Sequence, residues 1–149
     1  MRFSANNPVK TAWFLALAGF VPFAAMAMLM LASGKYHPFF PVIEDAFRTY
    51  SAIILSFLGG TRWGMALLGK TVSARVISFS VLPALFGWLA LFLPAPVSIT
   101  ILLLGYCAQG AWDSMSIHAG GAPDWFAQLR ITLTLLVAFA HLLAFFAAY

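Results

Sequence analysis

Residues 11–34 read TAWFLALAGFVPFAAMAMLMLASG, an uncharged run that lies between Lys10 and Lys35. A helix needs about 20 consecutive apolar residues to cross the hydrocarbon core of a bilayer, and this run is long enough. It contains Ala25-Met26-Ala27, which resembles a signal-peptidase site, but the apolar stretch continues past that point and is too long for a signal peptide. We therefore interpret it as an uncleaved first membrane span.

The composition of the whole chain supports the same interpretation. Hydrophobic residues make up 63% of the 149 residues and charged residues only 8%, whereas soluble domains carry about 25% charged residues. The apolar runs are continuous and lack the alternation of a β-barrel, so closed backbone hydrogen bonding in lipid requires helices. We expect an all-α, polytopic membrane helical bundle with five transmembrane helices in a single membrane domain, residues 1–149. The predicted spans are 11–32, 47–68, 76–93, 97–117 and 126–148. Pro22 and Pro83 fall inside two of them and are expected to kink their helices.

The cationic residues predict an orientation. They are scattered over the ends of the apolar segments rather than clustered, which argues against a nucleic-acid partner. Cytoplasmic loops of membrane proteins carry the excess of Lys and Arg, so we expect a cytoplasmic N-terminus and a periplasmic C-terminus. This orientation puts Arg2, Lys10, Lys70, Arg75 and Arg130 inside, and Lys35 and Arg48 outside.

Arg62 lies deep inside the second predicted span. An arginine at a helix centre costs roughly 2.5 to 3.5 kcal/mol to insert, so it needs a partner. Asp113 is the best candidate, because the rise per residue places Arg62 about 21 Å and Asp113 about 24 Å from the outer ends of two parallel spans. Two interpretations stay open: a buried pair that fixes the helix register, for which removing either residue costs more than removing both, or a contact to a ligand or ion.

Polar residues on one face of each of the last two spans extend this region. They predict a polar core or ligand pocket near the ion pair, although ordinary interhelical hydrogen bonds would explain the same residues. His141 is expected to be a hydrogen-bonded core histidine rather than a haem ligand or a proton relay. The candidate residues are Arg62, Trp63, Tyr106, Gln109, Asp113, Arg130, Thr134 and His141.

The second span also carries Ser56, Gly60 and Gly64 at intervals of four residues. Small residues at this spacing make a nearly flat helix face on which another helix can pack closely, and Arg62 should point away from it. The pattern leaves open whether the neighbour belongs to this chain or to another.

No catalytic motif, no spacing of metal ligands and no cofactor motif is present, so we expect no catalytic residues, no metal and no cofactor, and enzyme activity is uncertain and disfavoured. The single cysteine, Cys107, excludes an internal disulfide and is expected to be a small buried hydrophobe.

Two segments resemble a known family. Residues 50–64, YSAIILSFLGGTRWG, look like a signature of the domain-of-unknown-function family 3429, which includes mitochondrial transmembrane protein 69, and residues 125–134, WFAQLRITLT, are similar to its second recurrent stretch. The resemblance implies a small multi-pass protein of a bacterial inner membrane, with Arg62, Trp63, Trp125 and Arg130 as motif residues. It implies no mechanism.

These observations lead to two hypotheses about function. The first is a packing partner, accessory subunit or assembly factor for another membrane protein, or a homo-oligomer, because the chain has short loops, a small-residue face and no catalytic set. The alternative is a binding or carrier protein for a small anionic or amphipathic ligand near Arg62 and Asp113. The odd number of spans and the lack of an internal repeat argue against a self-sufficient transporter.

Overall fold

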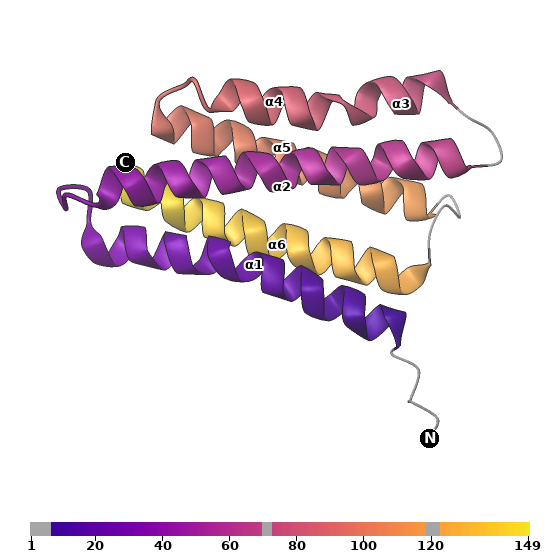
Figure 1. The fold of residues 1–149 in the computed structure, drawn as a ribbon, viewed down its shortest axis with the longest axis horizontal. Helices are drawn as coiled ribbons and strands as arrows, with labels where there is room; N and C mark the ends of the chain where they lie inside the picture. The colour runs from indigo at the N-terminus through magenta and orange to yellow at the C-terminus, as the bar shows by residue number, and fades with distance from the viewer. Residues whose placement is uncertain (1–6, 70–72, 119–122) are drawn as a thin grey trace.

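The structure, a computed structural model, describes residues 7–69, 73–118 and 123–149, with the backbone alone for residues 116–118. Helices make up most of these segments, and no strand is found in them. They form an all-α bundle of elongated helices that lie side by side (Figure 1). The helices are α1 (Pro8–Ser33), α2 (Phe40–Leu68), α3 (Ala74–Ser80), α4 (Leu82–Ala90), α5 (Ala95–His118) and α6 (Asp124–Ala148).

Four of these helices are long and apolar enough to cross a membrane: α1, α2, α6 and the Ala95–Met115 part of α5. The third pass through the bundle is divided into α3 and α4, which meet at Val81. Pro83 explains the division, because proline removes one helical hydrogen bond and clashes with the preceding turn. The predicted all-α membrane bundle is therefore confirmed, and its third pass is broken near Pro83. Pro22, by contrast, lies inside an undivided α1.

Local sequence explains where the first two helices begin. The Asn7 side chain caps α1 by accepting a hydrogen bond of 3.0 Å from the backbone N–H of Val9. α2 starts at Phe40, before the predicted start at residue 47, and includes the charged residues that suggested a loop. There Arg48 pairs with Asp45 at 2.5 Å, one turn apart, so these charges belong to the first turns of the helix.

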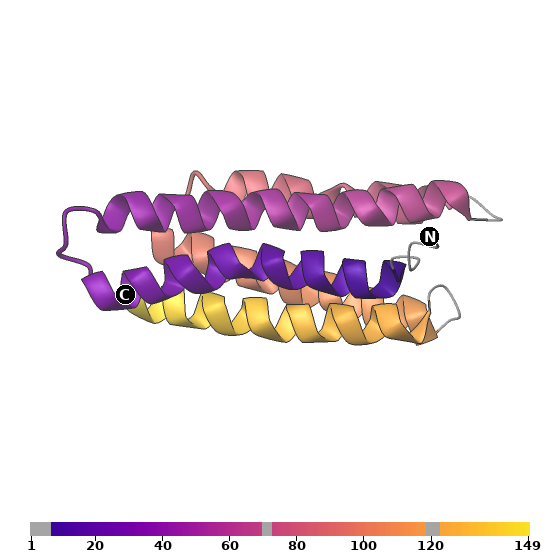
Figure 2. The ribbon, with the colours of Figure 1, turned by 60° about the horizontal axis from the view of Figure 1, so that its bottom comes forward.

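Successive passes run in opposite directions, so α2 and α5 are parallel to each other (Figures 1 and 2). One end of the bundle holds the start of α1, α3 and α6 and the end of α2 and α5. We call it the basic end, because Lys10 and Arg75 lie there. The described charges at the opposite end are two cations and two anions: Lys35, Arg48, Glu44 and Asp45.

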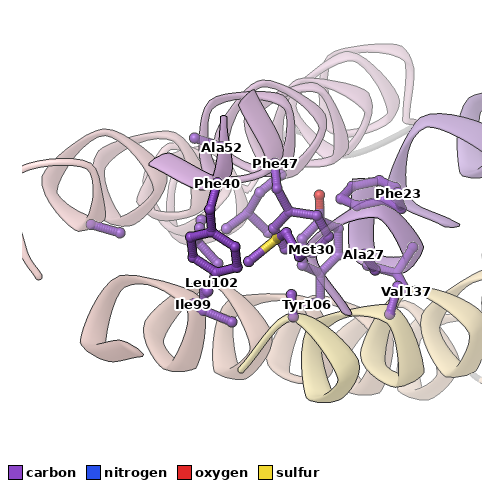
Figure 3. Close-up of a cluster of buried hydrophobic side chains, with 14 residues drawn as sticks. Phe23, Ala27, Met30, Phe40, Phe47, Ala52, Ile99, Leu102, Tyr106 and Val137 are labelled. Atoms are coloured by element: carbon purple, nitrogen blue, oxygen red, sulfur yellow. The ribbon is translucent and has the colours of Figure 1, made fainter. Parts of the chain in front are cut away.

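The apolar core lies between α1, α2, α5 and α6 (Figure 3). Phe23 of α1 is central to it: its ring lies 5.7 Å from that of Phe47 and 6.0 Å from that of Tyr106, both edge to face. Met30 and Leu102 fill the space toward the end opposite the basic end. Cys107, which we expected to be buried, is exposed on the outer face of α5. An apolar side chain can lie on either face of a membrane helix, since the lipid is as apolar as the core.

Glycines set the closest approaches between helices. A Cβ atom added to Gly59 would lie 2.5 Å from the backbone oxygen of Ser80, and one added to Gly110 would lie 2.6 Å from the Thr134 hydroxyl. Gly60 and Gly64 differ, because an added Cβ would meet nothing within 4 Å among the described residues. The predicted flat face is thus turned away from the described part of its own chain.

This contrast predicts opposite effects at two adjacent positions. Gly59→Ala should lower the free energy of unfolding by about 1 to 3 kcal/mol, because the methyl group meets backbone that cannot move aside. Gly60→Ala is the matched control and should leave stability unchanged or slightly raised, since alanine is the better helix former. Unfolding in mixed micelles, followed by the loss of helical circular dichroism, measures both. Equal stability of the two variants would contradict the α2–α3 packing.

Candidate ligand site in the bundle interior

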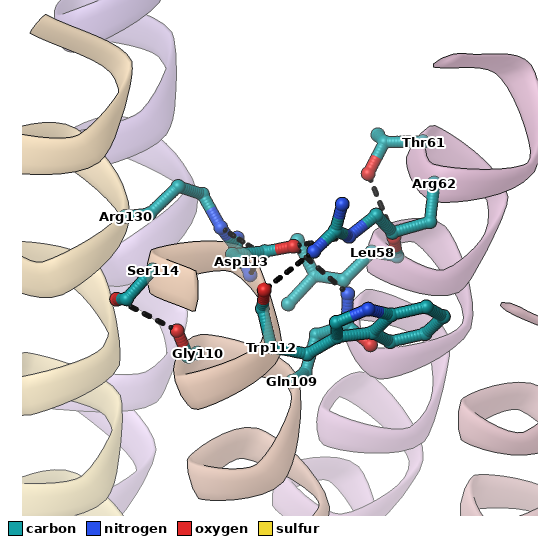
Figure 4. Close-up of polar contacts among 9 residues, drawn as sticks. All are labelled: Leu58, Thr61, Arg62, Gln109, Gly110, Trp112, Asp113, Ser114 and Arg130. Carbon is teal, nitrogen blue, oxygen red and sulfur yellow. Dashed lines mark hydrogen bonds and ion pairs between the residues drawn. The ribbon is translucent and has the colours of Figure 1, made fainter. Parts of the chain in front are cut away.

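Asp113 of α5 binds two arginines from two other helices (Figure 4). Its Oδ1 lies 2.7 Å from Nε of Arg62 on α2, which confirms the predicted pair. Its Oδ2 accepts a hydrogen bond of 2.6 Å from Nε of Arg130 on α6 and lies 2.5 Å from Nη2 of the same arginine. All three side chains are at most 10% exposed. The carboxylate therefore ties together three helices, and the pair that we expected is a triad.

Two neighbours on α5 support the triad. Arg62 Nη2 donates a hydrogen bond of 2.7 Å to the backbone oxygen of Trp112, and its guanidinium lies 4.6 Å from the centre of the Trp112 ring. Such a cation over an indole face is favourable, and more so away from water. Gln109 donates from Nε2 to Asp113 Oδ1 at 3.3 Å, one turn back along the helix. Gln109 is therefore a triad contact, as its position on the predicted polar face suggested.

Trp63 does not belong to this cluster, contrary to our expectation. Its side chain is 40% exposed on the outer face of α2. Adjacent helical residues point about 100° apart, so the inward direction of Arg62 turns its neighbour outward. The tryptophan at the ion pair is Trp112, which was not among the candidate residues of the sequence analysis.

Tyr106 and His141 form a second buried cluster with Ser51 of α2. His141 Nδ1 lies 2.8 Å from the backbone oxygen of Val137, so this nitrogen carries the proton, and Nε2 accepts a 2.7 Å hydrogen bond from the Ser51 hydroxyl. The Tyr106 hydroxyl donates to the Ser51 backbone oxygen at 2.8 Å. His141 is thus the predicted hydrogen-bonded core histidine. Ser51 was missed, since no local pattern pairs residues 90 positions apart.

A cavity of about 250 Å³ lies between α1, α2, α5 and α6, next to both clusters. Its walls are mostly apolar, and four polar side chains reach it: Thr61, Tyr106, Arg130 and Thr134. Arg62 and Asp113, around which we expected a pocket to form, do not line it. The structure therefore brings Arg130, Thr134 and Tyr106 of the predicted set to one cavity.

Arg130 connects the cavity to the triad. It is only 6% exposed, and its described contacts run from Nε and Nη2 to Asp113. No hydrogen bond or ion pair of its third nitrogen, Nη1, is found among the described residues. The charges of Arg62, Arg130 and Asp113 sum to +1, because two cations share one anion. A cavity wall therefore carries a buried guanidinium with hydrogen-bond donors to spare.

Among the side chains that the structure describes, no group of three or more His, Cys, Asp or Glu residues lies together in a way that could hold a metal ion.

Comparison with known proteins places these residues in a family. The family model described as "Protein of unknown function (DUF3429)" matches residues 8–146. The chain is 34% identical over 138 residues to transmembrane protein 69 of Xenopus tropicalis, covering 88% of this chain and 52% of that protein. It is 33% identical over 133 residues to transmembrane protein 69 of Mus musculus, covering 87% and 53%. The chain thus spans about half the length of these curated relatives. No solved structure matches it.

The triad predicts an unequal cost of removing its members. Asp113→Ala should lower the free energy of unfolding by about 3 to 5 kcal/mol, because it leaves two buried guanidiniums without their counter-ion. Arg62→Met should cost less, about 1.5 to 3 kcal/mol, since Asp113 keeps Arg130. The double variant should remain destabilised by the unpaired Arg130, and adding Arg130→Met should restore part of the loss. The same unfolding assay measures all four, and a double variant as stable as the unmodified protein would contradict the triad.

Proposed function

The chain belongs to the DUF3429 family of membrane proteins, and we propose that it binds an amphipathic anion inside the membrane, in the cavity that Arg130 lines. One observation carries the proposal: a guanidinium that is 6% exposed lies on the wall of an apolar cavity and shares its only described counter-ion with a second arginine.

The charge balance favours an anion. Burying an unpaired charge is expensive, and the cost falls when an opposite charge and hydrogen bonds compensate it. Asp113 supplies one negative charge to two arginines, so the triad keeps a formal excess of +1. A ligand carboxylate or phosphate beside Arg130 would balance this excess and accept the hydrogen bonds of Nη1.

The shape of the cavity favours a ligand with an apolar body. Ligand pockets are mostly apolar with a few polar groups that fix the orientation of the ligand. Here aromatic and aliphatic side chains make most of the wall, including Phe20 and Phe23 of α1, Ile54 of α2 and Leu133 of α6. Among the uncharged polar groups of the wall, the Thr134 hydroxyl can turn toward an acidic headgroup, whereas the Thr61 hydroxyl donates at 2.7 Å to the backbone oxygen of Leu58.

We place the protein in a bacterial inner membrane, with the basic end in the cytoplasm. The described charges favour this orientation by a small margin: Lys10 and Arg75 lie at the basic end with one acidic residue, Asp124, while Lys35 and Arg48 at the other end are matched by two acidic residues. Arg2 and Lys70, which also entered the prediction, lie outside the described residues.

A second candidate is an accessory subunit or assembly factor, the first hypothesis from the sequence. The open Gly60–Gly64 face favours it, because these glycines have no neighbour within 4 Å among the described residues, whereas Gly59, Gly87 and Gly105 are in close contact with other helices. Small residues that face outward let a second protein approach the backbone closely.

Native mass spectrometry of the protein, extracted gently from its own membrane, tests the first proposal. We expect a discrete small-molecule mass on the unmodified protein and its loss in Arg130→Gln, which keeps Arg62 to pair with Asp113. Arg48→Gln is the matched control, because Arg48 pairs with Asp45 at the opposite end, and it should retain the ligand. A mass that persists in Arg130→Gln would contradict binding at this cavity.

The same spectra test the second candidate. A stoichiometric protein that co-purifies with the chain should be lost when Gly60→Leu fills the open face. Cys107→Leu adds similar bulk to the outer face of α5 and should keep the partner. If Gly60→Leu leaves the complex intact, the Gly60–Gly64 face is not the interface.

A further inference from the structure

We infer that the ligand of this cavity is a fatty acid, held with its carboxylate at Arg130 and its single chain directed toward Phe23. The inference rests on the proposed function, since it names the chemical class of the amphipathic anion. Three features carry it: the charge of the triad, the size of the cavity and the position of its two ends in the bundle.

The buried arginine selects a small headgroup. Arg130 is 6% exposed, and the triad needs one negative charge to reach neutrality. A carboxylate is a compact monoanion whose two oxygens match the planar fork of a guanidinium. A glycerophosphate headgroup is larger and carries polar groups that would need partners of their own, and the described polar lining beyond Arg130 consists of Thr61, Tyr106 and Thr134 only.

The volume selects a single chain. Pockets for drug-sized ligands measure about 300 to 1,000 Å³, and this cavity of about 250 Å³ lies just below that range. The lining residues extend along α6 from Arg130 to Val137, a rise of roughly 10 Å at 1.5 Å per residue. A narrow apolar cavity of this length suits one acyl chain and leaves no room for two.

The two ends of the cavity match the two ends of a fatty acid. Arg130, near the start of α6, and Thr61, near the end of α2, lie in the half of the bundle toward the basic end, where a membrane lipid has its headgroup. Phe23 and Val137 lie deeper in the bundle, beside the Ser51–His141 cluster. A chain that points from Arg130 to Phe23 therefore has the direction of a lipid in the leaflet at the basic end.

The walls also indicate how the chain enters. Leu15 of α1 and Phe57 of α2 line the cavity and are 62% and 65% exposed, so the mouth lies at the outer surface of the bundle between these helices. Toward the basic end, α1 diverges from α2 (Figure 1). At the deeper end the Tyr50 hydroxyl joins them with a hydrogen bond of 2.8 Å to the Gly19 backbone oxygen. Entry is thus lateral, from the lipid, with the deep end closed.

Photo-crosslinking tests the inference. The protein is placed in phosphatidylcholine nanodiscs with a decanoic acid that carries a diazirine in its chain, since a chain of this length matches the cavity, and unlabelled decanoate is the competitor. We expect saturable labelling of peptides from α1 and α6. Arg130→Gln should reduce it about tenfold, the loss expected for one charge-assisted hydrogen bond.

Ala16→Phe provides a second variant that leaves the triad intact. Ala16 lines the cavity, so the added ring should fill it and also remove the labelling. Ala18→Phe is the matched control, because Ala18 is exposed on the same helix and lies outside the cavity, and it should label normally. Helical circular dichroism confirms that each variant is folded.

Two kinds of result would overturn the inference. If the methyl ester of decanoate displaces the label as well as decanoate does, the carboxylate is not selected. If a two-chain phosphatidylglycerol displaces it equally well, the single chain is not selected. Labelling that survives both Arg130→Gln and Ala16→Phe would place the lipid elsewhere. If native mass spectrometry still finds an Arg130-dependent ligand of another class, the fatty acid inference fails and the proposed function stands. If neither experiment finds an Arg130-dependent ligand, both fail.

Discussion

The bundle depends on one carboxylate. Asp113 on α5 joins Arg62 on α2 and Arg130 on α6, so three helices share a single buried anion. In lipid the apolar faces of helices pack against each other or against acyl chains with little preference, and polar contacts therefore decide which helix meets which. The Ser51–His141 bond between α2 and α6 adds a second such contact. Together the two clusters fix the rotation of α2, with Arg62 and Ser51 inward and Gly60, Trp63 and Gly64 away from the core.

The same triad that orients the helices also places a positive charge beside the cavity. A balanced pair of charges would serve packing alone, but two guanidiniums on one carboxylate keep an excess positive charge in a medium that stabilises charge poorly. Only one of the two arginines, Arg130, lines the cavity. The two arginines therefore differ in position: Arg62 contacts Asp113 and Trp112 and anchors α2 to α5, whereas Arg130 joins α6 to Asp113 and lines the cavity.

Several site residues were predictable and others were not. Matching the depths of Arg62 and Asp113 along parallel spans sufficed to pair them, because the helical rise is regular. Arg130 was predicted to lie on the polar, inward face of the last span. Its pairing with Asp113, however, depends on how α6 packs against α5, and the spacing of residues along the sequence does not determine that packing. Trp63 was misplaced because it adjoins Arg62 in the chain, whereas a helix turns adjacent side chains to different faces. The expected pocket beside Arg62 instead formed beside Arg130, where α1 diverges from α2.

The chain by itself determined the fold class and the family. Long uncharged runs can satisfy their backbone only as helices in lipid, and the motif around Arg62 indicated the family that the comparisons then showed. Only the tertiary structure decided which arginines share Asp113, which glycines face a neighbour, and where a cavity remains. The physical reason is that these properties depend on the rotation and crossing of helices, and contacts between residues as distant as Ser51 and His141 set them. The periodicity of the sequence shows which residues lie on the same face of a helix, but it does not show which other helix packs against that face.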